Sequence, residues 1–154
     1  MAKLYFEDFE PGREFPLGPK TIDAAEIIEF ATEFDPQPMH LSEEAGRRTI
    51  LGGLSASGWH TSSMMMRMLI DAYLLSSVSE GAPGIDFMEW KKPVLAGDTL
   101  AGRSTVIATR ILRSRPNIGI ASFRHELQNQ RGETVLVSEN SIMFRRRPTE
   151  GEAA

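Results

Sequence analysis

The sequence predicts an α+β protein in which a curved antiparallel sheet wraps around one long central helix. Two observations lead to this prediction. Residues 52–75 read as a glycine- and serine-rich entry into a long helix with few charges and with apolar residues on most sides, which is typical of a helix covered by other structure. After Gly81 the pattern changes to apolar and β-branched runs separated by turns, which indicates strands that follow one another along the chain.

The first half of the chain is expected to hold a short strand and a helix. The strand lies near Phe15, and the stretch 21–34 has the pattern of a helix that begins at Thr21 or Asp23. Asp23 with Glu26 three residues later fits a capping box. The apolar face of this helix is predicted to consist of Ile27, Phe30, Ala31 and Phe34.

Pro36 is expected to end this helix, because it disfavours helical geometry at Asp35 and lacks the N–H needed to continue. A short helical turn with Ser42 as its cap should follow. In the second half, residues 119–130 alternate apolar and polar side chains, as in a strand with one buried face. The expected strands are 85–90, 99–115, 119–130 and 134–144.

Length and composition restrict the function. The 154 residues fit one domain, with an ordered core from about residue 4 to 146 and a frayed C-terminal tail. A formal charge of −4 argues against nucleic-acid binding. The chain has no cysteine, which excludes disulfides, thiolate metal sites and a cysteine nucleophile. Neither a signal peptide nor a membrane-spanning run is present, so we expect a cytoplasmic protein without a membrane partner.

The stretch FDPQPMH, residues 34–40, places Asp35 and His40 five positions apart with two prolines between them. Taken alone, an aspartate before a proline is typical of a helix end and a turn. A carboxylate and an imidazole can also divide the roles of general base and general acid. Pro36 and Pro38 would hold the segment extended and keep the pair in place. Two ligands without a third are too few for a closed metal site, so no metal is expected.

Four stretches resemble one known family. FDPQPMHLSEEA is similar to the hydratase motif Gly-Asp-x-Asn-Pro-x-His, and GGLSASGWH, WKKPVLAGDTL and ELQNQRGETVL support the likeness over nearly the whole chain. The chain resembles the MaoC-like dehydratases of the hot-dog fold, which include the R-specific enoyl-CoA hydratases. Phe34 stands where hydratases often have glycine, and Gln37 stands where they have asparagine.

The resemblance implies roles for particular residues. Asp35 and His40 would be the catalytic pair, Gly58 a backbone donor to an oxyanion at the start of the central helix, and Ser63 a polar support of the site. His60 is interpreted either as a pocket residue or as a satisfied core histidine, and His125 as structural. The substrate pocket is expected to include Phe34, Gln37, Pro38, Trp59 and His60.

The implied activity is the interconversion of trans-2-enoyl-CoA and 3-hydroxyacyl-CoA. No cofactor is expected beyond the coenzyme A of the substrate, and family members imply a homodimer, or an assembly of dimers, with the site where two subunits meet. A hot-dog thioesterase and a non-catalytic acyl-CoA binding module remain alternatives. A set of arginines is interpreted in two ways that fit equally well: they contact the phosphates of coenzyme A, or they lie at solvated strand ends. These residues are Arg103, Arg110, Arg113, Arg115, Arg145, Arg146 and Arg147.

Overall fold

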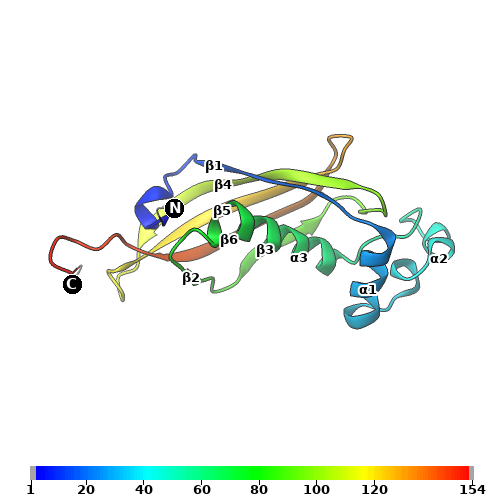
Figure 1. Ribbon diagram of the computed structural model, residues 1–154, viewed down its shortest axis with the longest axis horizontal. Helices are drawn as coiled ribbons and strands as arrows, with labels where there is room; N and C mark the ends of the chain where they lie inside the picture. Colours follow the sequence, from blue (N-terminus) through cyan, green and yellow to red (C-terminus); the bar gives the residue numbers. More distant parts are fainter. Residues whose placement is uncertain (1–2, 153–154) are drawn as a thin grey trace.

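The structure is a computed structural model that describes residues 3–152. One sheet runs along the length of the molecule, and helix α3 (Gly58–Leu69) lies along one face of it (Figure 1). Helices α1 (Ala24–Phe34) and α2 (Glu43–Arg47) lie at one end, beyond the start of α3 (Figure 1). The first turn of α3 therefore points toward the segments that carry the predicted catalytic pair.

The sheet is antiparallel throughout, and its first four strands have the order β1-β4-β5-β6. Two short strands, β2 and β3, pair with the other edge of β6. The strands are β1 (Glu14–Thr21), β2 (Ser79–Gly81), β3 (Ile85–Trp90), β4 (Thr99–Ile111), β5 (Ile118–Gln128) and β6 (Thr134–Arg145). Two 3₁₀ turns, η1 (Phe6–Asp8) and η2 (Pro38–His40), and a π-helical turn, η3 (Ile70–Leu74), complete the described elements.

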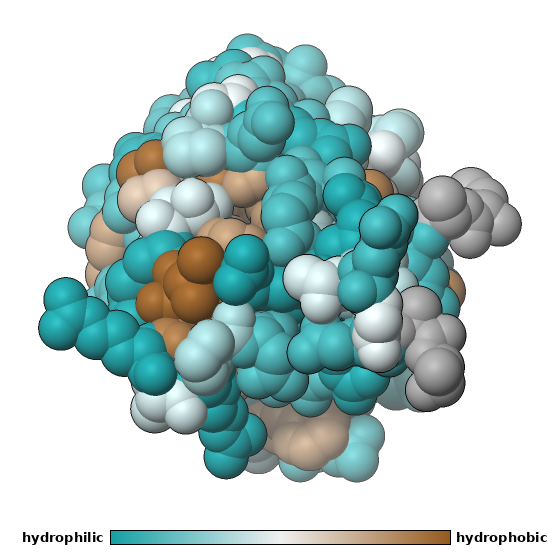
Figure 2. Space-filling view, turned by 90° about the vertical axis from the view of Figure 1, so that its left-hand side faces the viewer, coloured by the Kyte–Doolittle hydropathy of each residue, from teal (hydrophilic) through white to brown (hydrophobic). Residues whose placement is uncertain are grey.

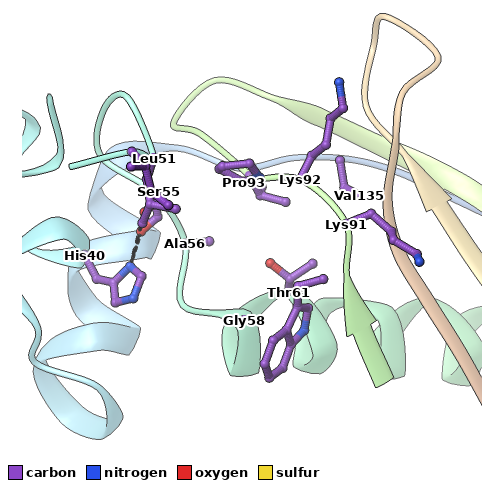
Figure 3. Close-up of a pocket in the computed structure, with 13 residues that line it drawn as sticks. His40, Leu51, Ser55, Ala56, Gly58, Thr61, Lys91, Lys92, Pro93 and Val135 are labelled. Carbon is purple, nitrogen blue, oxygen red and sulfur yellow. Dashed lines mark hydrogen bonds between the residues drawn. The ribbon is translucent and has the colours of Figure 1, made fainter. Parts of the chain in front are cut away.

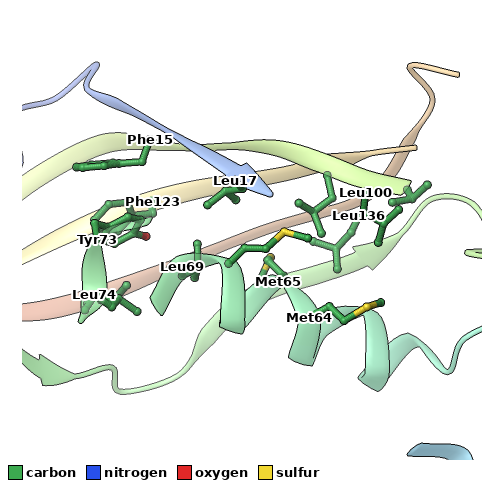
Figure 4. Packing of buried hydrophobic residues seen from close by; sticks show 14 of the residues in the cluster. Phe15, Leu17, Met64, Met65, Leu69, Tyr73, Leu74, Leu100, Phe123 and Leu136 are labelled. Atoms are coloured by element: carbon green, nitrogen blue, oxygen red, sulfur yellow. The ribbon is translucent and has the colours of Figure 1, made fainter. Parts of the chain in front are cut away.

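The core lies between α3 and the face of the sheet that α3 covers. Figure 4 shows side chains of α3 and η3 directed at the strands, with Tyr73 beside Phe123 and Met65 below Leu100 and Leu136. Each fully buried side chain of this size contributes roughly 1.5–3 kcal/mol. The alternation predicted for β5 is confirmed, because its buried face carries Ala121, Phe123, His125 and Leu127.

The predicted fold class is confirmed: the curved antiparallel sheet around a central helix is the hot-dog fold. The expectation that other structure covers α3 on most sides is wrong for one side. Trp59 is 60% exposed and Met66 is 45% exposed. The sheet curves around only one side of the helix, so these two side chains stay largely uncovered by the elements that the structure describes.

Helix α1 begins after Asp23, one of the two start positions predicted for it, and not at Thr21. Asp23 is the N-cap, with its Oδ1 accepting from Glu26 N at 2.8 Å, whereas Thr21 is the last residue of β1. The predicted apolar face is confirmed for Ile27 and Ala31, which are buried. It is wrong for Phe34, which is 66% exposed because it is the last residue of α1 and its ring packs on Phe30.

Strand β4 ends at Ile111 and not at residue 115, because residues 112–117 form the turn into β5. Pro116 has no N–H to offer to a strand there.

The predicted C-terminal tail follows residue 146. The part of it that the structure describes begins beside η1, where Arg147 N donates to Glu7 Oε2 at 2.9 Å. Its last two residues lie outside the described residues. Among residues 3–152, no helix has both the length and the apolar character that crossing a membrane requires.

Helix α2 packs closely against the loop that leads into α3. Glu43 Oε2 accepts from Leu54 N at 2.8 Å. A Cβ atom at Gly46 would lie 1.9 Å from the carbonyl oxygen of Gly53, so only glycine allows the two backbones to approach this closely. The contact fixes the position of the loop 52–57.

We predict that Gly46→Ala destabilises the protein by about 2 kcal/mol, because the added methyl group forces the two backbones apart. Urea unfolding followed by circular dichroism measures this change. Gly84→Ala is the matched control, because a Cβ atom at Gly84 meets nothing within 4 Å, and it should change the free energy of unfolding by less than about 0.5 kcal/mol. Equal effects in both variants would contradict the close-approach argument.

Candidate active site

Asp35 is the C-cap residue that directly follows helix α1. Its N–H still donates to Ala31 O at 2.9 Å, but its own backbone is no longer helical, as expected before Pro36. The carboxylate is held on one side by Gln37, whose Nε2 donates to Asp35 Oδ1 at 2.7 Å. Gln37 therefore orients the carboxylate and leaves Oδ2 free to face His40.

His40 is buried at the end of η2, which begins at Pro38. Its Nδ1 lies 2.7 Å from the carbonyl oxygen of Ser55. A carbonyl oxygen can only accept, so the hydrogen-bond network assigns a proton to Nδ1. Nε2 lies 3.4 Å from Asp35 Oδ2. Nε2 is therefore the nitrogen whose proton can change during a reaction, and it faces the carboxylate.

Three polar neighbours favour the ionised form of Asp35. The Ser57 hydroxyl has the largest effect in lowering the pKa of this carboxyl, and the Gln37 amide and His40 lower it further, whereas partial burial acts in the opposite direction. Ser57 Oγ is buried, and it forms no hydrogen bond of regular geometry with the described residues. The Ser57 hydroxyl therefore acts on Asp35 as a nearby dipole that helps to keep the carboxylate in its base form to lower pH.

A short backbone pairing holds the loop that supplies Ser55 and Ser57. Ala56 N donates to Val94 O at 2.8 Å, and Ala96 N donates to Leu54 O at 3.1 Å. These two bonds tie the loop to the segment between β3 and β4 on both sides of Ser55. The carbonyl that accepts from His40 is therefore fixed from both directions.

Gly58 is the first residue of α3, so its N–H has no acceptor within the helix. The indole of Trp90 packs across this position, and a Cβ atom at Gly58 would lie 2.6 Å from the ring. Trp90 is held there by a hydrogen bond from its Nε1 to Ser62 Oγ, 3.2 Å long. The glycine thus serves two purposes, because it accommodates the indole and leaves a free backbone donor at a helix N-terminus.

His40 and Gly58 line one cavity of about 320 Å³ (Figure 3). In Figure 3 the imidazole of His40 lies on the side of Ser55 and Ala56, and the start of α3 lies opposite. The further lining residues are mostly apolar, with Lys91 and Lys92 as the cations: Ile50, Leu51, Ser55, Ala56, Thr61, Trp90, Lys91, Lys92, Pro93, Val94 and Val135. The cavity can hold an apolar chain with a polar group near His40.

Other predicted site residues lie elsewhere. Ser63 Oγ donates to Trp59 O at 2.8 Å, and both residues line a second cavity on the other flank of α3. His60 stacks on Phe30, with ring centroids 4.6 Å apart, and lines a shallow cleft together with Phe34. The structure therefore places Asp35 beside His40 and Gln37, and Gly58 lines the His40 cavity together with His40. Asp35, Gln37 and Pro38 are not among the lining residues of that cavity. Ser63, Trp59, His60 and Phe34 also lie away from it.

The prediction from sequence missed Ser55 and Ser57. One signal for Ser57 was available, because the residue before a helix is commonly a serine that caps it. Here the Ser57 side chain caps nothing and is available to Asp35. The role of Ser55 rests on its backbone carbonyl, which no side-chain pattern reveals.

The arginines considered for phosphate contact mostly have acidic partners. Arg103 pairs with Glu14 and Glu126, and Arg145 pairs with Glu80. Arg146 and Arg147 pair with Glu7 and Asp8 of η1. Figure 2 shows this end of the molecule, near the termini, as a mostly hydrophilic face with only small hydrophobic patches.

In the part of the chain that the structure describes, no group of three or more histidine, aspartate or glutamate side chains could hold a metal ion.

The hot-dog fold of this chain carries a carboxylate and an imidazole, Asp35 and His40, in the segment between α1 and α3. A family model described as "MaoC like domain" matches residues 8–122. The chain belongs to the MaoC-like dehydratase family.

Three known proteins illustrate the likeness. The MaoC-like dehydratase from Rhodospirillum rubrum is 40% identical, with a TM-score of 0.83 over 95% of this chain and 99% of that one. The uncharacterized protein YdeM of Bacillus subtilis (strain 168) is 26% identical over 93% of this chain and 100% of its own length. The R-hydratase PhaJ1 from Pseudomonas aeruginosa is 19% identical, and its TM-score of 0.76 over 94% of this chain and 88% of that one shows a shared fold.

We predict that Ser57→Ala raises the pKa of Asp35 toward its ordinary range, because the variant removes the hydroxyl that lowers this pKa most. Carbon-13 NMR of the aspartate carboxyl groups between pH 2 and 7 measures the change. Ser63→Ala is the control, since the Ser63 hydroxyl donates to Trp59 O and should leave the Asp35 titration unchanged. An unchanged pKa in Ser57→Ala would refute the role given to this hydroxyl.

Proposed function

We propose that the protein is a hydratase or dehydratase of acyl thioesters that interconverts trans-2-enoyl-CoA and 3-hydroxyacyl-CoA. One observation carries the proposal. Asp35 Oδ2 and His40 Nε2 lie 3.4 Å apart, and His40 shares its cavity with the free N–H at the start of α3. The family membership supports the same class of reaction.

In hydration, Asp35 accepts a proton from water while the water oxygen bonds to C3 of the enoyl group. The C2–C3 π electrons move toward the thioester, and protonated His40 delivers its Nε2 proton to C2. Asp35 ends protonated and His40 neutral, and transfer of the proton from Oδ2 to Nε2 restores the starting state. The 3.4 Å separation is slightly too long for a good direct hydrogen bond, so both atoms can contact one water oxygen.

Negative charge develops on the thioester oxygen during this addition. The N–H of Gly58 is a preorganised donor for that oxygen, because it lies at the positive end of the α3 dipole and has no intrahelical acceptor. The mostly apolar lining of the cavity would strengthen this interaction by excluding water. Lys91 and Lys92 line the same cavity, but each already pairs with a carboxylate, Glu89 and Glu133 respectively.

We predict that Asp35→Asn and His40→Gln each lower kcat by about a thousandfold, because each removes a group that moves a proton. The measurement is the hydration of a short panel of trans-2-enoyl-CoA thioesters, followed by the loss of ultraviolet absorbance. Asp71→Asn is the matched control, since it only breaks an exposed pair with Arg67 and should retain full activity.

Other outcomes would favour a different function. Release of free thiol from acyl-CoA without a change at the double bond would replace the proposal with a thioesterase. Tight binding of the thioesters without turnover would replace it with a non-catalytic binding module. Full activity in both Asp35→Asn and His40→Gln would refute the proposed acid–base pair.

We also propose that the working form is a homodimer. Trp59 and Met66 leave one side of α3 apolar and exposed, and Ile85 and Trp90 of β3 add exposed apolar side chains beside it. Within residues 3–152, β3 pairs only with β6, so its outer edge has free backbone groups. An edge strand beside an uncovered apolar helix face is a surface that a second copy of the chain can cover.

We predict a dimer in sedimentation-velocity centrifugation of the purified protein. Ile85→Lys should shift the protein to monomer, because it places a charge in the apolar surface along the β3 edge. Ile107→Lys introduces the same charge at an exposed isoleucine of β4 and should leave the dimer intact. A monomeric wild type, or equal effects of the two lysines, would refute the proposed interface.

A further inference from the structure

A second cavity, of about 310 Å³, lies on the flank of α3 away from His40. We call it the His125 cavity. Its apolar lining comes from α3 and β3, and three polar residues of β5 and β6 also line it, namely His125, Ser138 and Asn140. His125 is only 1% exposed, so the sheet buries a polar ring beside a largely apolar space. The mechanism above makes no use of it.

A chain of hydrogen bonds runs from the core to this cavity. The Tyr73 hydroxyl lies 3.0 Å from Ser104 Oγ, and Ser104 Oγ lies 2.9 Å from His125 Nδ1. On the other side of the ring, His125 Nε2 lies 2.7 Å from Asn140 Oδ1. Tyr73, Ser104 and His125 are buried, whereas Asn140 is half-buried at the cavity.

Burial sets the direction of these bonds. Among the described residues, the Tyr73 hydroxyl has Ser104 as its sole hydrogen-bond partner, so a satisfied phenol must donate to it. Ser104 then donates to His125 Nδ1, which leaves the proton of the neutral ring on Nε2. His125 Nε2 donates in turn to Asn140 Oδ1. Burial also lowers the pKa of His125, which is consistent with a neutral ring.

The consequence concerns Asn140. Its oxygen is occupied by His125, and its NH2 group donates to no protein acceptor within residues 3–152. Ser138 already donates to Phe87 O at 2.9 Å and can only accept further. Ser62 and Ser63 of α3 also line the cavity, but their hydroxyls already donate to Gly58 O at 2.9 Å and to Trp59 O at 2.8 Å. Within residues 3–152, no lysine or arginine lines the cavity. The cavity therefore offers mostly hydrocarbon walls and the Asn140 amide as a neutral donor, but no positive charge.

We propose that the His125 cavity binds an apolar group that carries an uncharged oxygen, with Asn140 Nδ2 donating to that oxygen. The inference rests on the proposed function in one respect, because it identifies this group as the distal part of the substrate's acyl chain. The preferred substrates are thus acyl thioesters with a hydroxyl, ether or ketone oxygen on the chain. A carboxylate fits less well, since the cavity has no cation to pair with it.

The location supports this assignment. Trp90 lines the His40 cavity and Trp59 lines the His125 cavity, and the two indoles meet edge to face with centroids 5.4 Å apart. The two cavities thus share one wall. Trp59, Met66 and Ile85 also belong to the surface that a second subunit would cover, so dimerisation would close the His125 cavity.

Binding should distinguish oxygenated from plain chains. A plain hydrocarbon would remove water from the Asn140 amide without replacing the hydrogen bond, and an oxygen in reach would satisfy it. The probes are hexyl-CoA and octyl-CoA thioethers and their terminally hydroxylated counterparts, which cannot be hydrated. Fluorescence of Trp59 and Trp90, the two tryptophans of the chain, reports their binding.

We expect the hydroxylated thioether of the better-fitting length to bind about tenfold more tightly than the plain one. Asn140→Leu should abolish or reverse this preference, because leucine has a similar size and no donor. Asn117→Leu makes the same change at an exposed position and should keep the preference. Equal affinities in the wild type, or an unchanged preference in Asn140→Leu, would overturn the inference. A preference for oxygen without hydration of any enoyl thioester would refute the proposed function alone.

The direction of the hydrogen bonds has its own test, which does not require a variant. Nitrogen-15 NMR of the three histidine side chains should show His125 as the neutral ring with the proton on Nε2 at pH 7. A proton on Nδ1 would reverse the chain of bonds and turn the Asn140 oxygen toward the cavity. That result would overturn the proposed donor, whatever the binding data show.

Discussion

The burial of α3 against the sheet is the constraint on which the other features depend. The apolar side chains of α3 are buried only where the sheet curves over the helix. Buried residues such as Met65 and Leu69 of α3, and Tyr73 of η3, fix the rotation of the helix about its own axis. This rotation decides which groups reach the two cavities. It places the free N–H of Gly58 opposite His40 and leaves the side with Trp59 and Met66 outside the core.

The candidate site is built by joining two irregular segments to this rigid helix. One segment, 35–40, carries the carboxylate and the imidazole, and the other, 54–57, carries the groups that orient them. The bond between His40 Nδ1 and Ser55 O joins the two segments, and the contact between Gly46 and Gly53 holds α2 against the second one. Side chains on loops are positioned accurately here because backbone atoms fix the loops.

Local signals in the sequence were sufficient for the fold class and for part of the site. Residue periodicity located β3 at its observed bounds, the Asp23 cap began α1, and Pro36 ended it beside Asp35. These features depend on neighbours within a few positions. The contact of Trp90 with Gly58 and the hydrogen-bond chain from Tyr73 to Asn140 join residues 15 or more positions apart, which no local pattern can bring together.

His125 illustrates that difference most clearly. Its place in an alternating strand correctly predicted a buried side chain, and burial alone suggested a structural role. The strand pairing sets Ser104 opposite His125, whereas Asn140 lies opposite Phe123 and still reaches the ring. Its hydrogen bonds thus follow from the register of three strands and not from the residue itself.

The closeness of Asp35 and His40 has a stereochemical consequence under the proposed mechanism. Two groups whose reactive atoms are 3.4 Å apart cannot lie on opposite faces of a flat alkene held between them. Hydroxyl and hydrogen must then join C3 and C2 from the same face, so one substrate orientation yields one enantiomer at C3. In heavy water the same constraint places the deuterium at C2 in a single configuration relative to the new hydroxyl.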